Sequence, residues 1–423
     1  MSPKTPYTTS TEATKHALVP KLRFPEFESL GSWNEYFGDS LFDQISDKKP
    51  EPGLPVLAIT QEHGAIPRHL IDYHVSVSEK SIESYKVVQV GDFIISLRSF
   101  QGGIEYSEYQ GICSPAYVVL RRCVDGNDAY FKQYLKTDRF IQILTKNLEG
   151  LRDGKMISYK QFSELSIPVP TAPEQQKIAD CLSSLDELIA AQARKVDALK
   201  THKKGLMQQL FPSEGEAQPR LRFPEFRDAG EWEEVALGTI AEIKLGKMLD
   251  KQKNTTGHLL PYLNNASVRW NEVDTADLPV MFFNDNEIDR FGLKIGDVVV
   301  CEGGEPGRAA VWDGQIPELK FQKAIHRVRF NVPFEPKLLV LHLENLSGTT
   351  QFEMLFTGGG IQHLTRETFS RLKIPLVDYA EQQRIAHCLA SLDYLITAAT
   401  QEVKTLKTHK KGLMQQLFPS VAL

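Results

Sequence analysis

A fifteen-residue sequence, LKTHKKGLMQQLFPS, occurs twice without a change, at residues 199–213 and again at 406–420. It ends a longer repeat, because residues 174–213 align with 381–420 without a gap and are identical at 29 of 40 positions. A second copied sequence, LRFPEF, lies at residues 22–27 and 221–226, and in each copy a Gly and a Trp follow at the same distance. The chain is therefore a tandem duplication of units of roughly two hundred residues, and this constrains its architecture more than any other feature.

Shorter patterns are also repeated at equivalent positions of the two units. The pattern Phe-Ser-x-Leu-x-Ile-Pro occurs at residues 162–168 and 369–375, and a Gly-Asp pair precedes an apolar run at 91–92 and 296–297. Between these landmarks the halves differ: SLRSFQGGIEYSEYQG in the first has no counterpart in the second, which carries CEGGEPGRAAVWDGQ. The two units share a framework and differ in the regions that the framework holds.

The forty-residue repeat has the pattern of a long helix. Its apolar residues recur at alternating steps of four and three, which is the 3.5-residue period of a coiled-coil seam. A Thr or Asp stands three residues before Glu174 and Glu381, a capping-box pattern, and Pro212 and Pro419 end the two segments. Each helix would be roughly 60 Å long and would need a partner for its apolar stripe, which the other copy provides. The predicted seam consists of Ile178, Leu182, Leu185, Ile189, Val196, Leu199, Leu206, Leu210, Ile385, Leu389, Leu392, Ile396, Val403, Leu406, Leu413 and Leu417.

Some positions in these helices do not suit a simple seam. Gln192, Lys203 and Lys410 are polar residues at seam positions. Gly205 and Gly412 lie near the helix ends, where glycine lowers helix stability. Either these glycines mark a close approach of two backbones, or they are tolerated because they lie near the ends.

The regions between the copied sequences, about residues 33–170 and 232–375, contain short β-type runs separated by Gly, Pro, Asn and Asp clusters, with short helical stretches between them. We expect each to form a compact β-rich domain. The predicted fold is α+β, with two β-rich α/β domains separated by two long antiparallel coiled-coil helices and related by pseudo-twofold symmetry. The predicted segments are a mobile tail at 1–20, a first domain at 21–170, a central helix at 171–213, a second domain at 214–376 and a C-terminal helix at 377–423.

Composition narrows the class of protein. The net charge of −5 excludes a chain coated in basic residues, although a local basic face is still allowed. The chain has no apolar run long enough to cross a membrane, and its first residues lack the apolar core of a signal peptide. Five scattered cysteines without a C-x-x-C pair suit a reducing cytoplasm, with the thiols as small buried apolar groups.

No catalytic or metal-binding constellation stands out. The sequences GGEPG at 303–307 and GGG at 358–360 lack the residues that follow a phosphate loop, so tight turns are the better interpretation. The Asn/Asp-Pro-Pro-aromatic motif expected of an amino methyltransferase is absent, and the acidic residues near 313–320 are too closely spaced for a nuclease metal site. We therefore predict that the chain is not an enzyme.

A binding function fits better. Two non-identical domains on a rigid helical frame could each read a short stretch of duplex DNA, with the half-sites about one helical turn, ~34 Å, or a multiple of it apart. Arg and Lys suit guanine or phosphate, and Asn and Gln suit adenine, whereas the alternative is that these are solvated loop residues. The candidate DNA-binding residues are Arg98, Ser99, Gln101, Arg152, Lys155, Ser158, Tyr159, Lys160, Lys247, Asn264, Asn265, Arg269, Arg308, Gln362 and His363.

The duplicated helices would also present one outer surface twice. Residues of the copied sequence that lie off the seam are free to meet another protein, and two identical copies suit two copies of one partner. The candidate partner-binding residues are His202, Lys204, Gln208, His409, Lys411 and Gln415.

The order LRFPEF, variable domain, EQQKIADCLSSLDELI and LKTHKKGLMQQLFPS, repeated, resembles the specificity subunit of type I restriction-modification systems. The resemblance extends from about residue 21 to 420 and includes SFQGG in the first domain and GDVVVCEGG, GRAAVW and HRVRF in the second. It implies a non-catalytic cytoplasmic subunit whose two target recognition domains read the halves of an asymmetric, bipartite DNA target. The paired helices would set the spacer and dock two modification subunits.

The resemblance also implies the other components of the complex. The modification subunits would use S-adenosylmethionine to methylate adenine, and restriction subunits using ATP and Mg would join them, so this chain itself would bind no cofactor and no membrane. Two alternatives remain from the residues alone. One is a coiled-coil scaffold that binds only proteins, and the other is a stand-alone DNA-modifying enzyme, against which the missing motifs argue.

Overall fold

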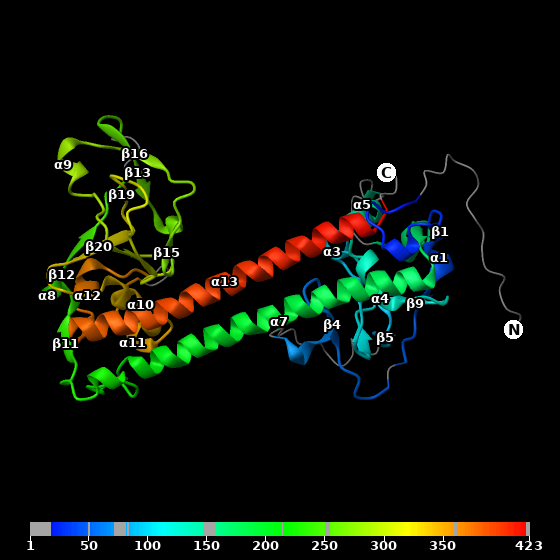
Figure 1. Cartoon of the computed structure of the whole chain (residues 1–423), viewed down its shortest axis with the longest axis horizontal. Coiled ribbons are helices and arrows are strands. Elements are labelled where there is room, and N and C mark those ends of the chain that lie inside the picture. Colours follow the sequence, from blue (N-terminus) through cyan, green and yellow to red (C-terminus); the bar gives the residue numbers. More distant parts are fainter. Residues whose placement is uncertain are drawn as a thin grey trace, which may run out of the picture. The chain divides into compact units, whose positions relative to one another are not determined.

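The chain forms two compact units. The computed structural model describes residues 18–49, 51–71, 82, 84–146, 157–213, 215–249, 254–358 and 362–419. Unit 1 consists of residues 1–193 and 401–423, and unit 2 consists of residues 194–400. Both predicted helical segments are therefore divided between the units, so each unit contains one domain, the first half of one helix and the second half of the other (Figure 1).

Unit 1 is built on a four-stranded antiparallel sheet with the order β2-β9-β6-β7, beside three two-stranded pairs, β1-β10, β3-β4 and β5-β8. Its short elements are η1 (Pro25–Phe27), β1 (Asn34–Phe37), α1 (Gly38–Leu41), β2 (Phe42–Ile45), β3 (Leu57–Thr60), β4 (Gly64–Pro67), η2 (Arg68–Leu70), β5 (Lys86–Val88), β6 (Phe93–Ile95), α3 (Ser99–Gly102), β7 (Glu105–Tyr106), β8 (Gly111–Cys113), β9 (Val118–Arg122), α4 (Asp128–Tyr134), α5 (Asp138–Lys146), α6 (Tyr159–Ser163) and β10 (Ser166–Val169).

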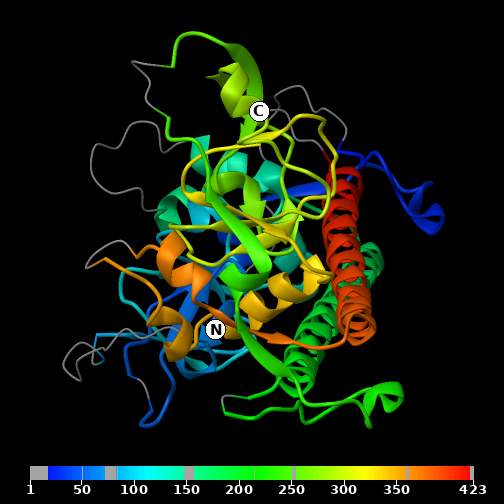
Figure 2. The same cartoon turned by 90° about the vertical axis from the view of Figure 1, so that its left-hand side faces the viewer.

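Unit 2 repeats this sheet as β12-β20-β17-β18 and repeats the pair β1-β10 as β11-β21. Its other sheets, β16-β13-β19 and β14-β15, have a different arrangement (green to yellow in Figure 2). Its short elements are η3 (Pro224–Phe226), β11 (Glu233–Ala236), α8 (Leu237–Ile240), β12 (Ala241–Leu245), β13 (His258–Leu263), η4 (Asn265–Ser267), β14 (Val268–Arg269), β15 (Glu272–Val273), β16 (Val280–Phe283), α9 (Asp285–Ile288), β17 (Val298–Cys301), β18 (Ala309–Val311), β19 (Lys320–Phe321), β20 (Ile325–Phe330), α10 (Pro336–Leu346), α11 (Thr350–Glu353), α12 (Arg366–Ser370) and β21 (Lys373–Leu376). The fold is α+β, as predicted.

The repeated segments form two helices of equal length. Helices α7 (Ala172–Leu210) and α13 (Tyr379–Leu417) each have 39 residues, or about 58 Å at 1.5 Å per residue. Within unit 1 the segments of the two helices are antiparallel, because Asp186 pairs with Lys410 whereas Gln192, further along α7, bonds Glu402, which precedes Lys410. Both helices start and end within a few residues of the predicted positions.

A buried ion pair joins the start of each long helix to its own domain. The guanidinium of Arg23 donates to both carboxylate oxygens of Glu174, at 2.7 and 2.7 Å, and Arg222 does the same to Glu381 at 2.7 and 2.6 Å. All four side chains are almost fully buried, and this bidentate pairing raises the pKa of both arginines. Each arginine comes from an LRFPEF copy, so the two copied sequences bind each other. The carboxylates therefore serve this contact rather than the reciprocal helix cap that the sequence suggested.

The next residue of each helix reinforces the junction. Gln175 accepts a hydrogen bond from the backbone of Asn127 and donates to the carbonyl of Pro170. Gln382 makes the equivalent bonds, accepting from the backbone N–H of Glu335 and donating to the carbonyl of Val377. The repeated Glu-Gln pair thus holds the domain from both sides of the helix start.

The far ends of the helices complete the hydrophobic cores. Phe418, after α13, packs in unit 1 against Tyr134, with ring centroids 5.5 Å apart. Phe211, after α7, packs in unit 2 against His342 at 5.7 Å, and burial lowers the pKa of this histidine to about 4, so it is neutral at pH 7. Identical sequences thus dock on different side chains.

The predicted seam residues are all buried or half-buried, although several of them, such as Ile178 and Leu417, pack into a domain core rather than only against the other helix. The two lysines at seam positions do not interrupt the packing. Lys203 is 5% exposed and pairs with Asp393 at 2.6 Å, and Lys410 pairs with Asp186 at 2.7 Å. These pairs are equivalent under the repeat and cross from one helix to the other.

Other expectations from the sequence need correction. Residues 1–17 of the predicted tail lie outside the described residues, but Leu18 is buried in the core of unit 1 and accepts a hydrogen bond from Trp33. A Cβ added at Gly205 or Gly412 would meet nothing within 4 Å, so these glycines do not mark a close backbone approach. Of the cysteines, Cys123 is exposed rather than buried. Within the described part of the chain, no helix is long and apolar enough to cross a membrane.

Replacing Arg222 with Ala should lower the free energy of unfolding by about 3 kcal/mol, because the carboxylate of Glu381 would stay buried without its partner. A matched control is Arg384→Ala. Arg384 pairs with Glu225 at 3.0 Å between the same two segments, but both side chains are about half exposed. Urea unfolding should show a much smaller loss for Arg384→Ala, since solvent screens that pair. Equal losses would contradict the anchoring role of the buried pair.

Candidate nucleic-acid interface

In the first domain, the sequence SFQGG forms a tight turn that carries two exposed polar side chains. Helix α3 is one turn long and is stabilised by the Ser99 hydroxyl, which accepts a hydrogen bond from the backbone N–H of Ser96 at 2.9 Å. Arg98 and Gln101 are exposed, and the Arg98 guanidinium makes no hydrogen bond or ion pair with another described residue. Ser99 is only 1% exposed. The prediction that Ser99 contacts DNA is therefore wrong, because its hydroxyl is committed inside the turn.

The geometry of the turn requires glycine at 103, whereas at 102 a larger residue would displace only the Gln61 side chain. Gly103 has φ +83°, and a Cβ there would lie 2.3 Å from the carbonyl oxygen of Leu135. A Cβ at Gly102 would lie 2.7 Å from the side chain of Gln61, which donates to the carbonyl of Arg98 at 3.3 Å. The turn is thus wedged between α4 and the β3–β4 hairpin, and this fixes where Arg98 is presented.

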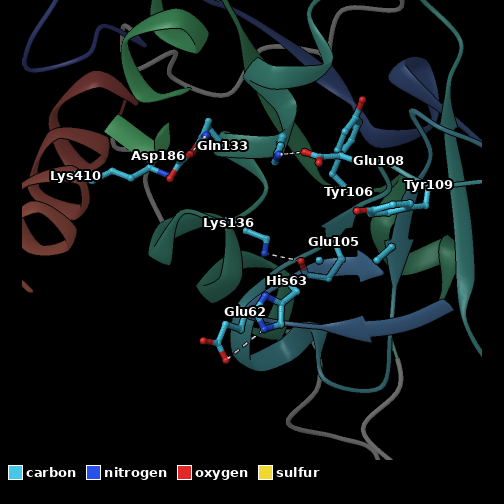
Figure 3. Close-up of a pocket in the computed structure, with 13 residues that line it drawn as sticks. Glu62, His63, Glu105, Tyr106, Glu108, Tyr109, Gln133, Lys136, Asp186 and Lys410 are labelled. Atoms are coloured by element: carbon cyan, nitrogen blue, oxygen red, sulfur yellow. Dashed lines mark hydrogen bonds and ion pairs between the residues drawn. The ribbon is translucent and has the colours of Figure 1, made fainter. Parts of the chain in front are cut away.

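A polar cavity of about 310 Å³ lies beside this turn (Figure 3). Its walls include an ion pair between the buried Glu105 and the half-buried Lys136 at 2.5 Å, and burial raises the pKa of Glu105 although Lys136 opposes the shift. Lys136 also donates to the carbonyl of Gln61 at 3.4 Å, so the pair supports the hairpin next to Arg98. Sequence reasoning missed these residues, because Gln61 and Lys136 are far from the turn in the chain and only the fold brings them to it.

The remaining candidates in the first domain lie elsewhere. Arg152 and Lys155 fall outside the described residues. Ser158 caps α6, with its hydroxyl accepting from the backbone of Gln161, and the Tyr159 hydroxyl donates to the carbonyl of Phe42 at 2.9 Å. Ser158 and Tyr159 thus have local structural bonds, whereas Lys160 is exposed.

In the second domain, three candidates converge on the turn at Gly303. Asn265 donates to the carbonyl of Gly303 at 2.8 Å, and Arg308 donates to the carbonyl of Asn265 at 2.8 Å. His363 forms a β-bridge with Gly303, and the adjacent Gln362 is exposed like His363. This cluster joins three distant segments at one surface, but Asn265 and Arg308 are half-buried and use these donors within the cluster, where Arg308 also pairs with Glu305 at 2.8 Å. The glycine-rich sequence that begins at Gly303 is a tight turn, with φ +78° at Gly304, as the sequence indicated.

The other second-domain candidates are not part of that cluster. Lys247 is half-buried and pairs with Glu287 at 2.5 Å, so its ammonium is used internally. The side chain of Asn264 caps helix η4. Arg269 is exposed and pairs with Asp274 at 2.9 Å. The first two of these side chains stabilise the fold where they stand, and Arg269 is held in a surface ion pair.

The candidate partner-binding residues are all exposed on the long helices. One of them, Lys411, pairs with Asp138 at 2.9 Å. Among the described residues, no group of three or more His, Cys, Asp or Glu side chains could hold a metal ion.

Comparisons with known proteins agree with this organisation. The model of the family described as "Type I restriction modification DNA specificity domain" matches residues 38–201 and 229–408, one copy on each repeat. The type I restriction enzyme MjaVIII specificity subunit of Methanocaldococcus jannaschii is 24% identical over 357 residues, covering 81% of each chain. The putative MjaX specificity subunit of the same organism is 24% identical over 393 residues, covering 88% of this chain and 87% of that protein. The solved S subunit of a type I restriction-modification system from M. genitalium has a similar fold, with a TM-score of 0.55, 17% identity and coverage of 96% of this chain and 100% of that one.

Replacing Arg98 with Ala should weaken binding to duplexes that the wild-type protein selects from a random pool by about tenfold or more, since a side chain that reads a base edge is typically worth 1–3 kcal/mol. The loss should be confined to one part of the selected sequence. Arg227→Ala is the control, because Arg227 is an exposed arginine outside both candidate surfaces. An equal loss in both variants, measured by fluorescence anisotropy at fixed salt, would show that Arg98 acts only as a general positive charge.

Proposed function

Because the chain belongs to the type I restriction-modification DNA specificity family, we propose that each of its two domains reads one half of an asymmetric, bipartite DNA target. The observation that carries this proposal is the contrast between the repeated frame and the two different polar surfaces that it holds. The same sheet order and the same Arg–Glu anchor hold an Arg98–Gln101 turn in one domain and an Asn265–Arg308–His363 cluster in the other. Two domains that share a sheet order and an Arg–Glu anchor but carry different polar side chains are suited to two different half-sites.

The long helices would set the distance between the half-sites and dock two modification subunits. Each helix is about 58 Å long, compared with roughly 34 Å for one turn of duplex. The pairs Asp186–Lys410 and Lys203–Asp393 would favour one register of the antiparallel helices, because an offset alignment would separate both pairs, and Lys203 is buried. A fixed register implies a fixed spacer.

The reaction itself would belong to the partners. The modification subunits would carry S-adenosylmethionine and methylate adenine, and restriction subunits using ATP and Mg would complete the nuclease in the cytoplasm. This chain would bind none of these cofactors. The net charge of −5 is compatible with a subunit that meets DNA on limited surfaces and proteins elsewhere.

Exchanging the first domain, residues 33–170, for that of a relative with another target should change one half-site and leave the other unchanged. The readout is a map of methylated adenines in a host genome that carries the chain with its partners. The reciprocal exchange of residues 232–375 is the matched control and should change only the other half. A protein-binding scaffold, the main alternative, would leave the methylated sequence unchanged in both exchanges.

Reversing Lys204 and Lys411 together to Glu should weaken assembly with the modification subunits while the half-site preference stays the same. The reason is that the two positions are equivalent in the repeat and both are exposed. Because Lys411 also pairs with Asp138, Asp138→Asn is the control that removes this pair without changing the lysine. Size-exclusion chromatography of the mixed subunits measures the outcome. If assembly survives the double reversal, the docking surface lies elsewhere on the helices.

A further inference from the structure

A second polar cavity lies in unit 1, between α5 and the end of α13. It has a volume of about 340 Å³. It belongs to neither candidate DNA-contacting surface, although two of its lining residues, Lys411 and Gln415, are candidate partner-binding residues. The lining residues on which the argument rests are Lys21, Tyr134, Thr137, Asp138, Arg139 and Lys411.

Two hydrogen-bond donors of this cavity are buried without a partner. Tyr134 is 2% exposed, and its hydroxyl makes no hydrogen bond to any described residue. The Nε of Arg139 is also buried and unpaired. Buried polar groups are almost always hydrogen-bonded, and a guanidinium can only donate. A hydrogen-bond acceptor in the cavity would satisfy both groups.

The charge around the cavity favours an anion. Lys21 and Arg139 make no ion pair with the described residues, and Asp138 is the one carboxylate among the described lining residues. Asp138 is already paired with Lys411 at 2.9 Å. Helix α5 has nine residues and begins at Asp138, so the positive end of its dipole lies at the same place, where the Thr137 hydroxyl already accepts from the backbone N–H of Phe140.

We propose that this cavity binds a phosphate group. The Tyr134 hydroxyl and the Arg139 guanidinium would donate to its oxygens, and Lys21 and the start of α5 would balance its charge. The cavity is larger than a phosphate ion alone, so it also has room for the groups that a phosphate ester carries. A phosphate of the DNA backbone and a free phosphate compound share this chemistry.

The site is a property of the first domain rather than of the repeated frame. In unit 2 the position of Tyr134 is taken by His342, because both contact the equivalent phenylalanine at a helix end. Helix α10 also continues from Pro336 to Leu346, whereas the first domain ends α4 at Tyr134 and begins α5 at Asp138. Unit 2 therefore has neither the hydroxyl nor the helix start at this position.

The test titrates the full chain with inorganic phosphate, using calorimetry and thermal unfolding, with chloride at equal ionic strength as the reference. We expect millimolar binding and a rise in the unfolding temperature. Tyr134→Phe, which removes only the hydroxyl, and Arg139→Gln should each weaken phosphate binding at least fivefold. Lys146→Gln removes one positive charge from the other end of α5 and should leave binding unchanged. Wild-type protein that does not bind phosphate would overturn the proposal, as would equal losses in all three variants.

A second measurement identifies the source of the phosphate. If DNA supplies it, Arg139→Gln should reduce the slope of log binding constant against log salt by about one. An unchanged slope, with phosphate binding still lost in the variant, would assign the site to a free phosphate compound. This second measurement rests on the proposed DNA recognition, but the half-site preference should be the same in every variant. Failure of the phosphate site would thus be distinguishable from failure of the proposed function.

Discussion

The buried pair between an LRFPEF arginine and the first glutamate of a long helix is the contact on which both units depend. In each unit the arginine uses its remaining donors on two backbone carbonyls, Leu30 and Gly31 in one and Ala229 and Gly230 in the other. The guanidinium therefore organises the loop, the helix start and the domain at once. Because both charges are buried, neither segment can move away without leaving an unpaired charge behind. This explains why the two copied sequences are duplicated together.

The C-terminal ends of the two helices also make equivalent contacts with the LRFPEF copies. The backbone N–H of Leu22 donates to Gln416, and that of Leu221 donates to Gln209, each at a distance near 3 Å. In unit 2 the two segments are neighbours in the chain, whereas in unit 1 they come from opposite ends of it. Each unit thus combines a domain, the first half of the helix that follows it and the second half of the other helix. This holds although the chain connects these segments differently in the two units. Such a frame can hold domains of different content, as the proposed reading of two different half-sites requires.

Much of this architecture could be predicted from the sequence, because it depends on local patterns that occur twice in the chain. The 3.5-residue period, the prolines and the copied sequences predicted two helices of equal length and two related α+β domains. Contacts between distant residues could not be predicted in the same way. Lys203 and Lys410 looked like faults in an apolar seam until the fold placed Asp393 and Asp186 opposite them. Ser99 looked like an exposed polar residue, but its hydroxyl closes the turn that presents Arg98.

The sequence by itself determined the duplication, the helices and the family. It also determined the division into a repeated frame and two different domains, because periodicity and repetition are properties of the chain alone. Only the tertiary structure decided which polar side chains are free. Arg98 and Lys247 are both basic residues that the sequence marked as candidates, yet one is exposed and the other is bound to Glu287. The burial of the unpartnered Tyr134 hydroxyl and Arg139 Nε likewise depends on where α4 ends and α13 packs. Burial and pairing are relations between distant segments, so they exist only once the chain has folded.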